Sequence, residues 1–446
     1  MPIKILLEFA VVLAAIFIGS RYGGVGLGLF GGLGVLVLTY VFGLPPTSPP
    51  VDVMLIILSV IMAAAVMEAA GGIDYLVDVA AGIIRRNPKQ ITLVAPLVAY
   101  AFTFGAGTGH VFYPLLPIIY ETAYDNDIRP ERPISVATIA SQQAITASPV
   151  SAAMAAMLVI MEPLGFGLPQ IMAICIPATL VGVIVAAFVQ QRVGKELKDD
   201  PEVQAKIKSG ELPPPGSLVQ GDAPKRELPP SARLSALIFL VGVAFIVVCG
   251  LVPALRPQIP TPDGSQPLSM TVTIQIVMLS IAALMLWLTK APVASVPTTK
   301  VAQAGLTAVI GIFGLAWLGD TFVQANLDWI VSTIGHIVTA YPILFAVGLF
   351  FTSVLLFSQA ATTRTLMPLG VELGIPPANL IGMWPAVNGY FFLPTYGTLI
   401  AAINFDRSGT TRIGRYVLNH SFMLPGLVAT IVAVITGVLI GRLLFG

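Results

Sequence analysis

The sequence predicts an all-α membrane protein with about 10 transmembrane helices and two re-entrant hairpins, arranged as two inverted repeats. Of the 446 residues, 56% are hydrophobic and only 10% are charged, which leaves too few polar side chains to cover a soluble globule. Similar patterns of apolar and polar residues recur in the two halves of the chain, and the basic residues concentrate in alternate loops. These three observations define the fold class.

The first predicted repeat covers residues 1–190. Its second apolar run is rich in glycine, and Gly24, Gly28 and Gly32 are expected to form a close helix-packing face. The polar stretch G-A-G-T-G-H at 105–110 separates two short apolar runs, which predicts a re-entrant hairpin. In order, the expected elements are spans at 5–20, 24–43 and 52–70, an amphipathic surface helix at 73–84, a hairpin at 90–124, a broken helix at 133–161 and a span at 170–190.

A hydrophilic segment at 191–232 follows, with seven basic residues, seven acidic residues and seven prolines. We expect a solvent-exposed cytoplasmic linker there. The second predicted repeat covers 233–446, and its surface helix repeats the spacing of the first at an offset of 254 residues. Its expected elements are spans at 233–252, 269–289 and 299–319, a surface helix at 327–338, a hairpin at 342–374, a broken helix at 377–404 and a span at 416–444.

An odd number of crossings in each half inverts the second repeat relative to the first. With the N-terminus outside, the loops that carry most of the 23 Lys and Arg residues lie in the cytoplasm, as the positive-inside rule requires. Only Lys4, Arg256 and Arg442 then lie outside, and Arg364 lies at membrane depth. Both termini are therefore expected on the outer side.

Inverted repeats with interrupted helices are typical of secondary transporters, which bind their substrate near the membrane midplane. Four interruptions are expected to converge there, at 105–110, 146–149, 358–363 and 388–396. Each would present helix N-terminal N–H groups, which favour an anion. Ser148 before Pro149 is typical of an N-cap followed by the first helical residue.

The guanidinium of Arg364 suits a carboxylate, which it can bind through two parallel hydrogen bonds. Neutral donors for a second carboxylate are Thr108, Ser148, Thr362, Thr363, Asn388 and Thr395. Alternatively, Arg364 neutralises a buried acid such as Asp320 or Glu68, and a single Ser or Thr bonds the backbone of its own helix. His110 is a candidate proton carrier, or else a hydrogen-bonding group.

Several blocks, in order along nearly the whole chain, resemble the Dcu family of anaerobic C4-dicarboxylate transporters. They include A-G-G-I-D-Y-L-V at 70–77, I-T-A-S-P-V-S-A-A at 145–153, S-Q-A-A-T at 358–362, L-P-T-Y at 393–396 and G-T-T-R-I-G at 409–414. The resemblance implies antiport of fumarate, succinate, malate and aspartate across the bacterial inner membrane, with fumarate entering as succinate leaves. It also implies membership of the ion-transporter superfamily, with scaffold and transport domains that move in an elevator-like way, a homodimer, and both termini periplasmic.

The blocks of the family coincide with the interruptions. The full candidate substrate site comprises Thr108, Gly109, His110, Thr146, Ser148, Pro149, Ser358, Gln359, Thr362, Thr363, Arg364, Asn388, Pro394 and Thr395. The expected partners are small dicarboxylates and the lipid bilayer. The net charge of +1 argues against a nucleic-acid partner, and we expect no cofactor or metal.

Two other functions remain open at this stage. One is a dicarboxylate symporter coupled to Na⁺ or H⁺, and the other is a membrane receptor that binds dicarboxylates without transporting them. An enzyme is disfavoured because the sequence carries no recognisable pairing of a nucleophile with a base.

Overall fold

The computed structural model describes residues 2–22, 25–217, 228–261, 264–330, 332, 341–356, 358–394, 396–414 and 418–446. Helices make up almost all the regular structure of these ranges, and the one sheet is a short antiparallel pair of strands. The all-α class is therefore confirmed.

Among the described residues before the linker there are nine α-helices, with short 3-10 turns between some of them. The bounds are α1 Pro2–Tyr22, α2 Gly26–Tyr40, α3 Val51–Ala69, α4 Gly72–Arg86, η1 Pro88–Gln90, α5 Ile91–Ala106, η2 Gly109–Phe112, α6 Leu115–Asp125, α7 Glu131–Gln143, η3 Ala144–Thr146, α8 Ala152–Met161, η4 Glu162–Leu164 and α9 Leu168–Gln190. The linker contains η5 Leu197–Asp199 and α10 Pro201–Lys208.

The second half differs from the first in a short strand pair between its first two helices. The bounds are α11 Pro230–Leu251, η6 Pro253–Leu255, β1 Gln258–Thr261, β2 Gly264–Pro267, α12 Met270–Thr289, η7 Val293–Thr298, α13 Lys300–Ala325, α14 Leu327–Ile330, α16 Ile343–Leu356, α17 Gln359–Glu372, α18 Pro377–Met383, η9 Trp384–Phe391, α19 Gly397–Phe405 and α20 Met423–Phe445. The second surface helix was expected over 327–338, and most of that range lies outside the described residues.

Within the described residues, six helices are long and apolar enough to cross a membrane: α3, α9, α11, α12, α13 and α20. The helices α2, α8 and α16 are apolar but shorter. The chain is thus a helical membrane protein, and the count of about ten crossings stays a prediction.

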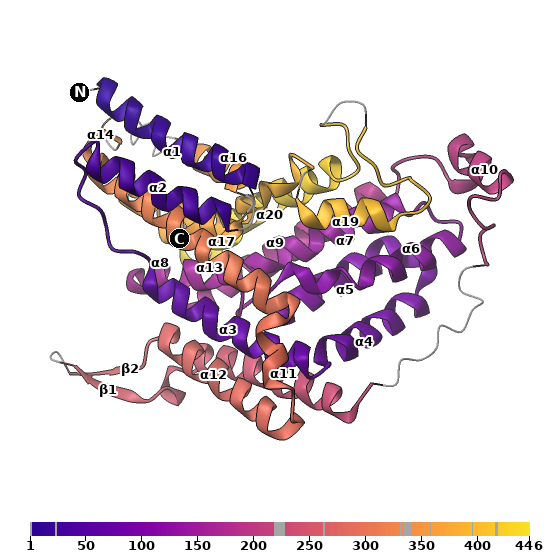
Figure 1. Cartoon of the computed structure of the whole chain (residues 1–446), viewed down its shortest axis with the longest axis horizontal. Helices are drawn as coiled ribbons and strands as arrows, with labels where there is room; N and C mark the ends of the chain where they lie inside the picture. Colours follow the sequence, from indigo (N-terminus) through magenta and orange to yellow (C-terminus); the bar gives the residue numbers. More distant parts are fainter. Residues whose placement is uncertain are drawn as a thin grey trace.

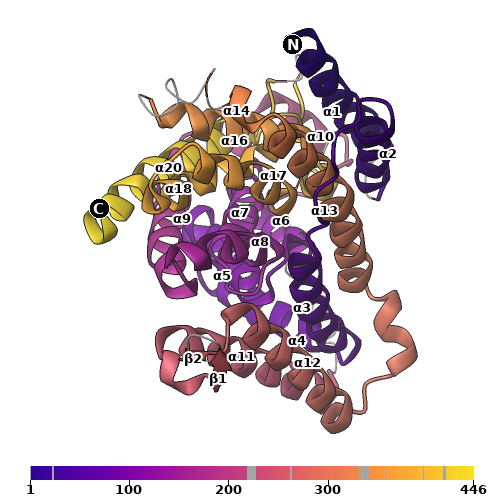
Figure 2. The same ribbon diagram turned by 90° about the vertical axis from the view of Figure 1, so that its left-hand side faces the viewer.

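Several helices of the first half pack against helices of the second half. The second helix of the first half, α2, packs against α13, and its third helix, α3, packs against α12. The last helices, α9 and α20, pack against each other. Figure 2 shows α2, α3, α12 and α13 in a curved layer on one side of the molecule, while the shorter helices α5 to α8 and α16 to α18 lie together on the other (Figure 1 gives the view at 90°).

The contact between α2 and α13 is close because glycines leave room for the two backbones. A Cβ atom on Gly28 would lie 1.9 Å from the carbonyl oxygen of Ile310, and one on Gly31 would lie 2.4 Å from the backbone of α13. The predicted packing face is therefore correct for Gly28 but wrong for Gly32, which has nothing within 4 Å of its Cβ position. Gly31 takes that place because helix neighbours on one face are separated by three residues as well as four. Gly24 lies outside the described residues.

The linker was expected to be solvent-exposed, but part of it is buried. Its first part packs onto the helical body of the molecule, where Leu197, Val203 and Leu212 are buried in one apolar cluster with residues of α5, α6 and α7. Burial of three apolar side chains stabilises this docking and orders the segment around α10. The composition of the linker hid these residues because they are few and scattered among polar ones.

Ion pairs complete the docking of the linker. Arg129, in the turn before α7, contacts Asp200 at 2.6 Å, and Arg132 contacts Glu196 at 2.9 Å. Burial alone would raise the pKa of Asp200, but hydrogen bonds from Arg129 and from the first turn of α10 outweigh it and hold that pKa below its usual value. The balance of charges in the linker was visible in the sequence, but their partners outside it were not.

Candidate functional site

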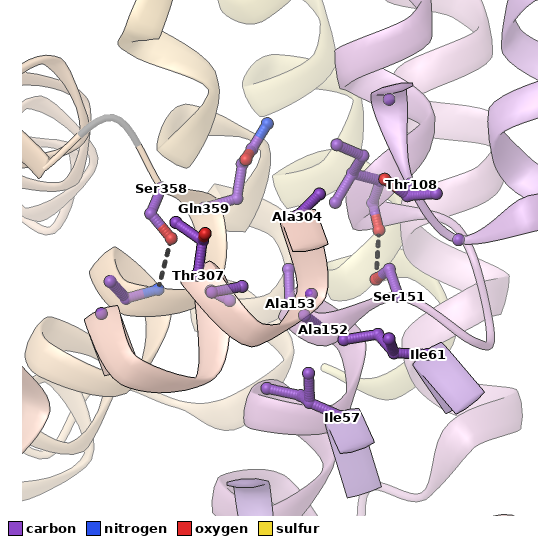
Figure 3. Close-up of a pocket in the computed structure, with 18 of the residues that line it drawn as sticks. Ile57, Ile61, Thr108, Ser151, Ala152, Ala153, Ala304, Thr307, Ser358 and Gln359 are labelled. Carbon is purple, nitrogen blue, oxygen red and sulfur yellow. Dashed lines mark hydrogen bonds between the residues drawn. The ribbon is translucent and has the colours of Figure 1, made fainter. Parts of the chain in front are cut away.

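A cavity of about 560 Å³ lies where the interrupted helices meet the layer of long helices. Three helices begin at its wall: α8 with Ala152, α17 with Gln359 and α19 with Gly397. The tip between α5 and η2 adds Thr108 and Gly109. Figure 3 shows Ser358 and Gln359 on one side of this cavity, with Thr108 and Ser151 on the other.

Serine residues start two of these helices. Ser151 caps α8 and accepts a hydrogen bond from the Met154 N–H at 3.0 Å, and Ser358 caps α17 and accepts one from the Ala361 N–H at 3.2 Å (Figure 3 draws the second bond). Each cap satisfies one of the free N–H groups of a first turn and leaves others for a ligand. The positive ends of the helix dipoles therefore point at the cavity.

The predicted N-cap at Ser148 is wrong. The Ser148 hydroxyl donates to the carbonyl of Phe104 at 2.7 Å, and α8 begins only after Ser151. The Ser-Pro pair is a good local cap signal, but here the hydroxyl ties the break between α7 and α8 to the end of α5. The position of the break itself, expected at 146–149, is close to the non-helical residues between Thr146 and Ala152.

The facing wall of the cavity is apolar. Residues from α2, α3 and α13 form this wall, and Thr307 is the one polar side chain among them. Figure 3 shows three of its apolar residues, Ile57, Ile61 and Ala304. Among the described residues, no charged side chain lines the cavity. A ligand there would meet helix N-termini and neutral donors on one side and hydrocarbon on the other.

A chain of buried carboxamides runs from the cavity into the protein. Gln359 donates to Gln142 at 3.0 Å and to Asn388 at 3.3 Å, Asn388 donates to Gln143 at 3.1 Å, and Gln143 donates to the Thr430 hydroxyl at 3.0 Å. All five side chains are buried. Hydrogen bonds thus join α7, α17, η9 and α20, which come from both halves of the chain.

Arg364 does not line the cavity. It lies on α17 with one guanidinium nitrogen 3.2 Å from a carboxylate oxygen of Asp320 on α13. This is one of the two alternatives that the sequence left open for its charge. The other acid, Glu68, accepts hydrogen bonds from the first N–H groups of α13, at Lys300 and Val301.

Apart from Arg364, the described site residues fall into two groups. Four of them line the cavity: Thr108, Gly109, Ser358 and Gln359. The residues of a second group are buried and do not line the cavity. They are Thr146, Ser148, Pro149, Thr362, Thr363, Asn388 and Pro394, and the polar ones among them have hydrogen-bond partners. The side chain of His110 and the whole of Thr395 lie outside the described residues.

Sequence reasoning missed several residues that the structure brings to the cavity, chiefly Gln142, Ser151, Tyr113 and Tyr396. Gln142 and Gln143 carried a usable signal, because two adjacent carboxamides in a helix that is buried along its whole length are costly unless they are bonded. Such a pair deserves the same scrutiny as an intramembrane arginine.

The fold and the cavity define a polytopic helical membrane protein with an internal site suited to an anion. The family model described as "Anaerobic c4-dicarboxylate membrane transporter" matches residues 4–445. The chain belongs to this family, DcuA_DcuB, and is a membrane transporter and not an enzyme.

Similar proteins cover almost the whole chain. The C4-dicarboxylate transporter DcuA of Wolinella succinogenes is 42% identical over 98% of this chain and 99% of its own length. DcuA of Escherichia coli K12 is 41% identical over 98% and 99%. The anaerobic C4-dicarboxylate transporter DcuB of Escherichia coli O6:H1 is 40% identical over 97% of each chain.

Proposed function

We propose that this protein exchanges C4-dicarboxylates, namely fumarate, succinate, malate and aspartate, across the bacterial inner membrane by antiport. The observation that carries the proposal is the convergence of three helix N-termini on one cavity, whose wall also contains Thr108 and Gln359. The relatives transport C4-dicarboxylates by name. A four-carbon dicarboxylate suits a cavity of about 560 Å³ with several separate groups of donors.

Charge explains why exchange would be favoured over one-way transport. Each helix N-terminus carries about half a positive charge, so three of them give about +1.5 in the empty site, and a bound dianion leaves about −0.5. Because the cost of moving charge through a low-dielectric medium rises steeply with its magnitude, the loaded site moves more easily than the empty one. A transporter of this kind returns most readily with a second dicarboxylate.

The layered arrangement supports a mechanism of alternating access. The apolar wall from α2, α3 and α13 belongs to a layer of long helices, which would act as the scaffold domain, and the helices that carry the N-termini would form the transport domain. The mostly apolar wall offers few polar groups to a moving site (Figure 3), and the ion pair between Arg364 and Asp320 would open during the movement. We further propose two inverted repeats, with the interrupted regions around 105–110 and 358–363 as hairpin tips, periplasmic termini and a homodimer.

Purified protein in proteoliposomes tests this function. Vesicles are loaded with labelled succinate, and efflux is measured with and without external fumarate, with Na⁺ present or replaced by K⁺. The proposal predicts that fumarate accelerates efflux equally in both salts. Flux that follows Na⁺ and ignores fumarate would show a symporter, and binding without flux would show a receptor; either result would overturn the proposal.

A further inference from the structure

We infer that Gln142, on the last turn of α7, is a substrate-binding residue that donates a hydrogen bond to one carboxylate and sets the preference for a dicarboxylate. This inference rests on the proposed function. Gln142 lines the cavity, although its side chain is almost completely buried. Its role follows from the direction in which the carboxamide chain is bonded.

The oxygen and the nitrogen of the Gln142 carboxamide have different hydrogen-bonding roles. Its oxygen, Oε1, accepts the hydrogen bond from Gln359 Nε2 at 3.0 Å. Its nitrogen, Nε2, donates a hydrogen bond to no acceptor among the described residues. This nitrogen is also not fully enclosed by protein atoms. An amide nitrogen can only donate, so Gln142 offers donors to whatever occupies the cavity.

The chain fixes this orientation. Gln359 uses both hydrogens of its amide, one on Gln142 and one on Asn388. Asn388 uses both of its own, one on Gln143 and one on the carbonyl of Pro385. Turning the Gln359 amide by 180° would set its oxygen against two other oxygens, so the direction of each bond enforces the next.

The hairpin tip makes room for the Gln142 amide. A Cβ atom built on Gly109 would lie 2.3 Å from Gln142 Nε2, which only a glycine avoids. The nitrogen therefore lies against the tip that also carries Thr108, at the edge of the cavity. The position of Gln142 at the cavity, the direction of its hydrogen bond with Gln359 and the space beside Gly109 agree on one result. The amide N–H₂ group of Gln142 faces the ligand.

The test exchanges a donor for an acceptor. In Gln142→Glu, one carboxylate oxygen still accepts the bond from Gln359, so the chain survives, while the other oxygen replaces the donor and repels a substrate carboxylate. KM for counterflow is measured with succinate and with succinamate, in which a carboxamide replaces one carboxylate. The wild type should prefer succinate, and Gln142→Glu should shift the ratio of the two KM values toward succinamate by about 100-fold.

Three further variants make the result specific. Gln303→Glu makes the same chemical change on an exposed residue of α13 and should leave the KM ratio unaltered. Gln142→Met keeps the volume without a donor and should raise KM for succinate by about 10- to 100-fold. Gly109→Ala should raise it as well, because its methyl group displaces the amide.

The outcomes separate the inference from the proposed function. If the wild type shows no dicarboxylate counterflow, the proposed function fails. If the wild type exchanges succinate and Gln142→Glu keeps the wild-type KM ratio, only the role of Gln142 is refuted. Should Gln142→Glu elute as aggregated protein, Gln142→Met decides instead, and an unchanged KM for succinate in that variant would refute the inference.

Discussion

The ion pair between Arg364 and Asp320 offers the sharpest prediction about a largely buried charge. The two side chains lie 3.2 Å apart, on α17 and α13, and are only 20% and 14% exposed. They therefore join a helix that begins at the cavity to a helix of the apolar wall. Neither residue lines the cavity.

The expected cost depends on whether one charge or both are removed. Removing one partner of a buried pair costs about 3–5 kcal/mol because the other charge is left uncompensated, and the partial exposure here reduces this to about 2–3 kcal/mol. Asp320→Asn combined with Arg364→Gln leaves no unpaired charge, and we expect this double variant to lose less than about 1 kcal/mol.

Two measurements follow the three variants: thermal stability in detergent and succinate counterflow in proteoliposomes. Each single variant should melt lower and exchange more slowly, and the double variant should recover most of both properties. The sequence-based alternative is that Arg364 binds a substrate carboxylate directly. In that case Arg364→Ala would abolish counterflow without loss of folded protein. A double variant that melts like the wild type but shows no counterflow would refute the structural role assigned to the pair.

Three further predictions concern packing, capping and the linker. Gly28→Ala should cost about 1–3 kcal/mol in stability through overpacking against α13, whereas Gly32→Ala, which faces open space, should be neutral or slightly stabilising in the same melting assay. Ser151→Ala removes a helix cap and should lower stability by about 1 kcal/mol; an unchanged melting temperature would show that the cap contributes nothing. Because the pKa of Asp200 is held below its usual value, its ion pair with Arg129 should keep the linker docked from pH 8 to pH 5 and release it below about pH 4. Release would be measured as faster limited proteolysis of the linker. The linker of Asp200→Asn should be cut rapidly at every pH.

Much of the fold followed from local patterns in the sequence. The apolar runs located the long helices, and the clusters of Gly, Ser and Pro located the interruptions within a few residues. This worked because the bilayer requires long apolar helices and makes polar breaks conspicuous. Thr108, Gly109, Ser358 and Gln359 were found in this way, and all four line the cavity.

The remaining features depend on contacts between distant segments. Arg364 could be recognised as an unusual charge, but only the packing of α17 against α13 shows Asp320 beside it. Gln142 could have been noticed as half of a carboxamide pair, but the direction of its amide is set by Gln359, which is 217 residues further along the chain. Ser148 carried the stronger local cap signal, yet Ser151 caps the helix because Ser148 is bonded to the end of α5.

The central claim is that the cavity binds dicarboxylates, and the most direct measurement is protection of a cysteine placed in its wall. Ala304 lies on α13 within the cavity lining, and the native Cys175 and Cys249 are both buried, so Ala304→Cys provides a selective label (Figure 3). A charged, membrane-impermeant thiol reagent should modify it, and succinate should slow the reaction at concentrations near its KM for counterflow, whereas butyrate should not. Modification at the same rate with saturating succinate, or equal protection by butyrate, would contradict the claim.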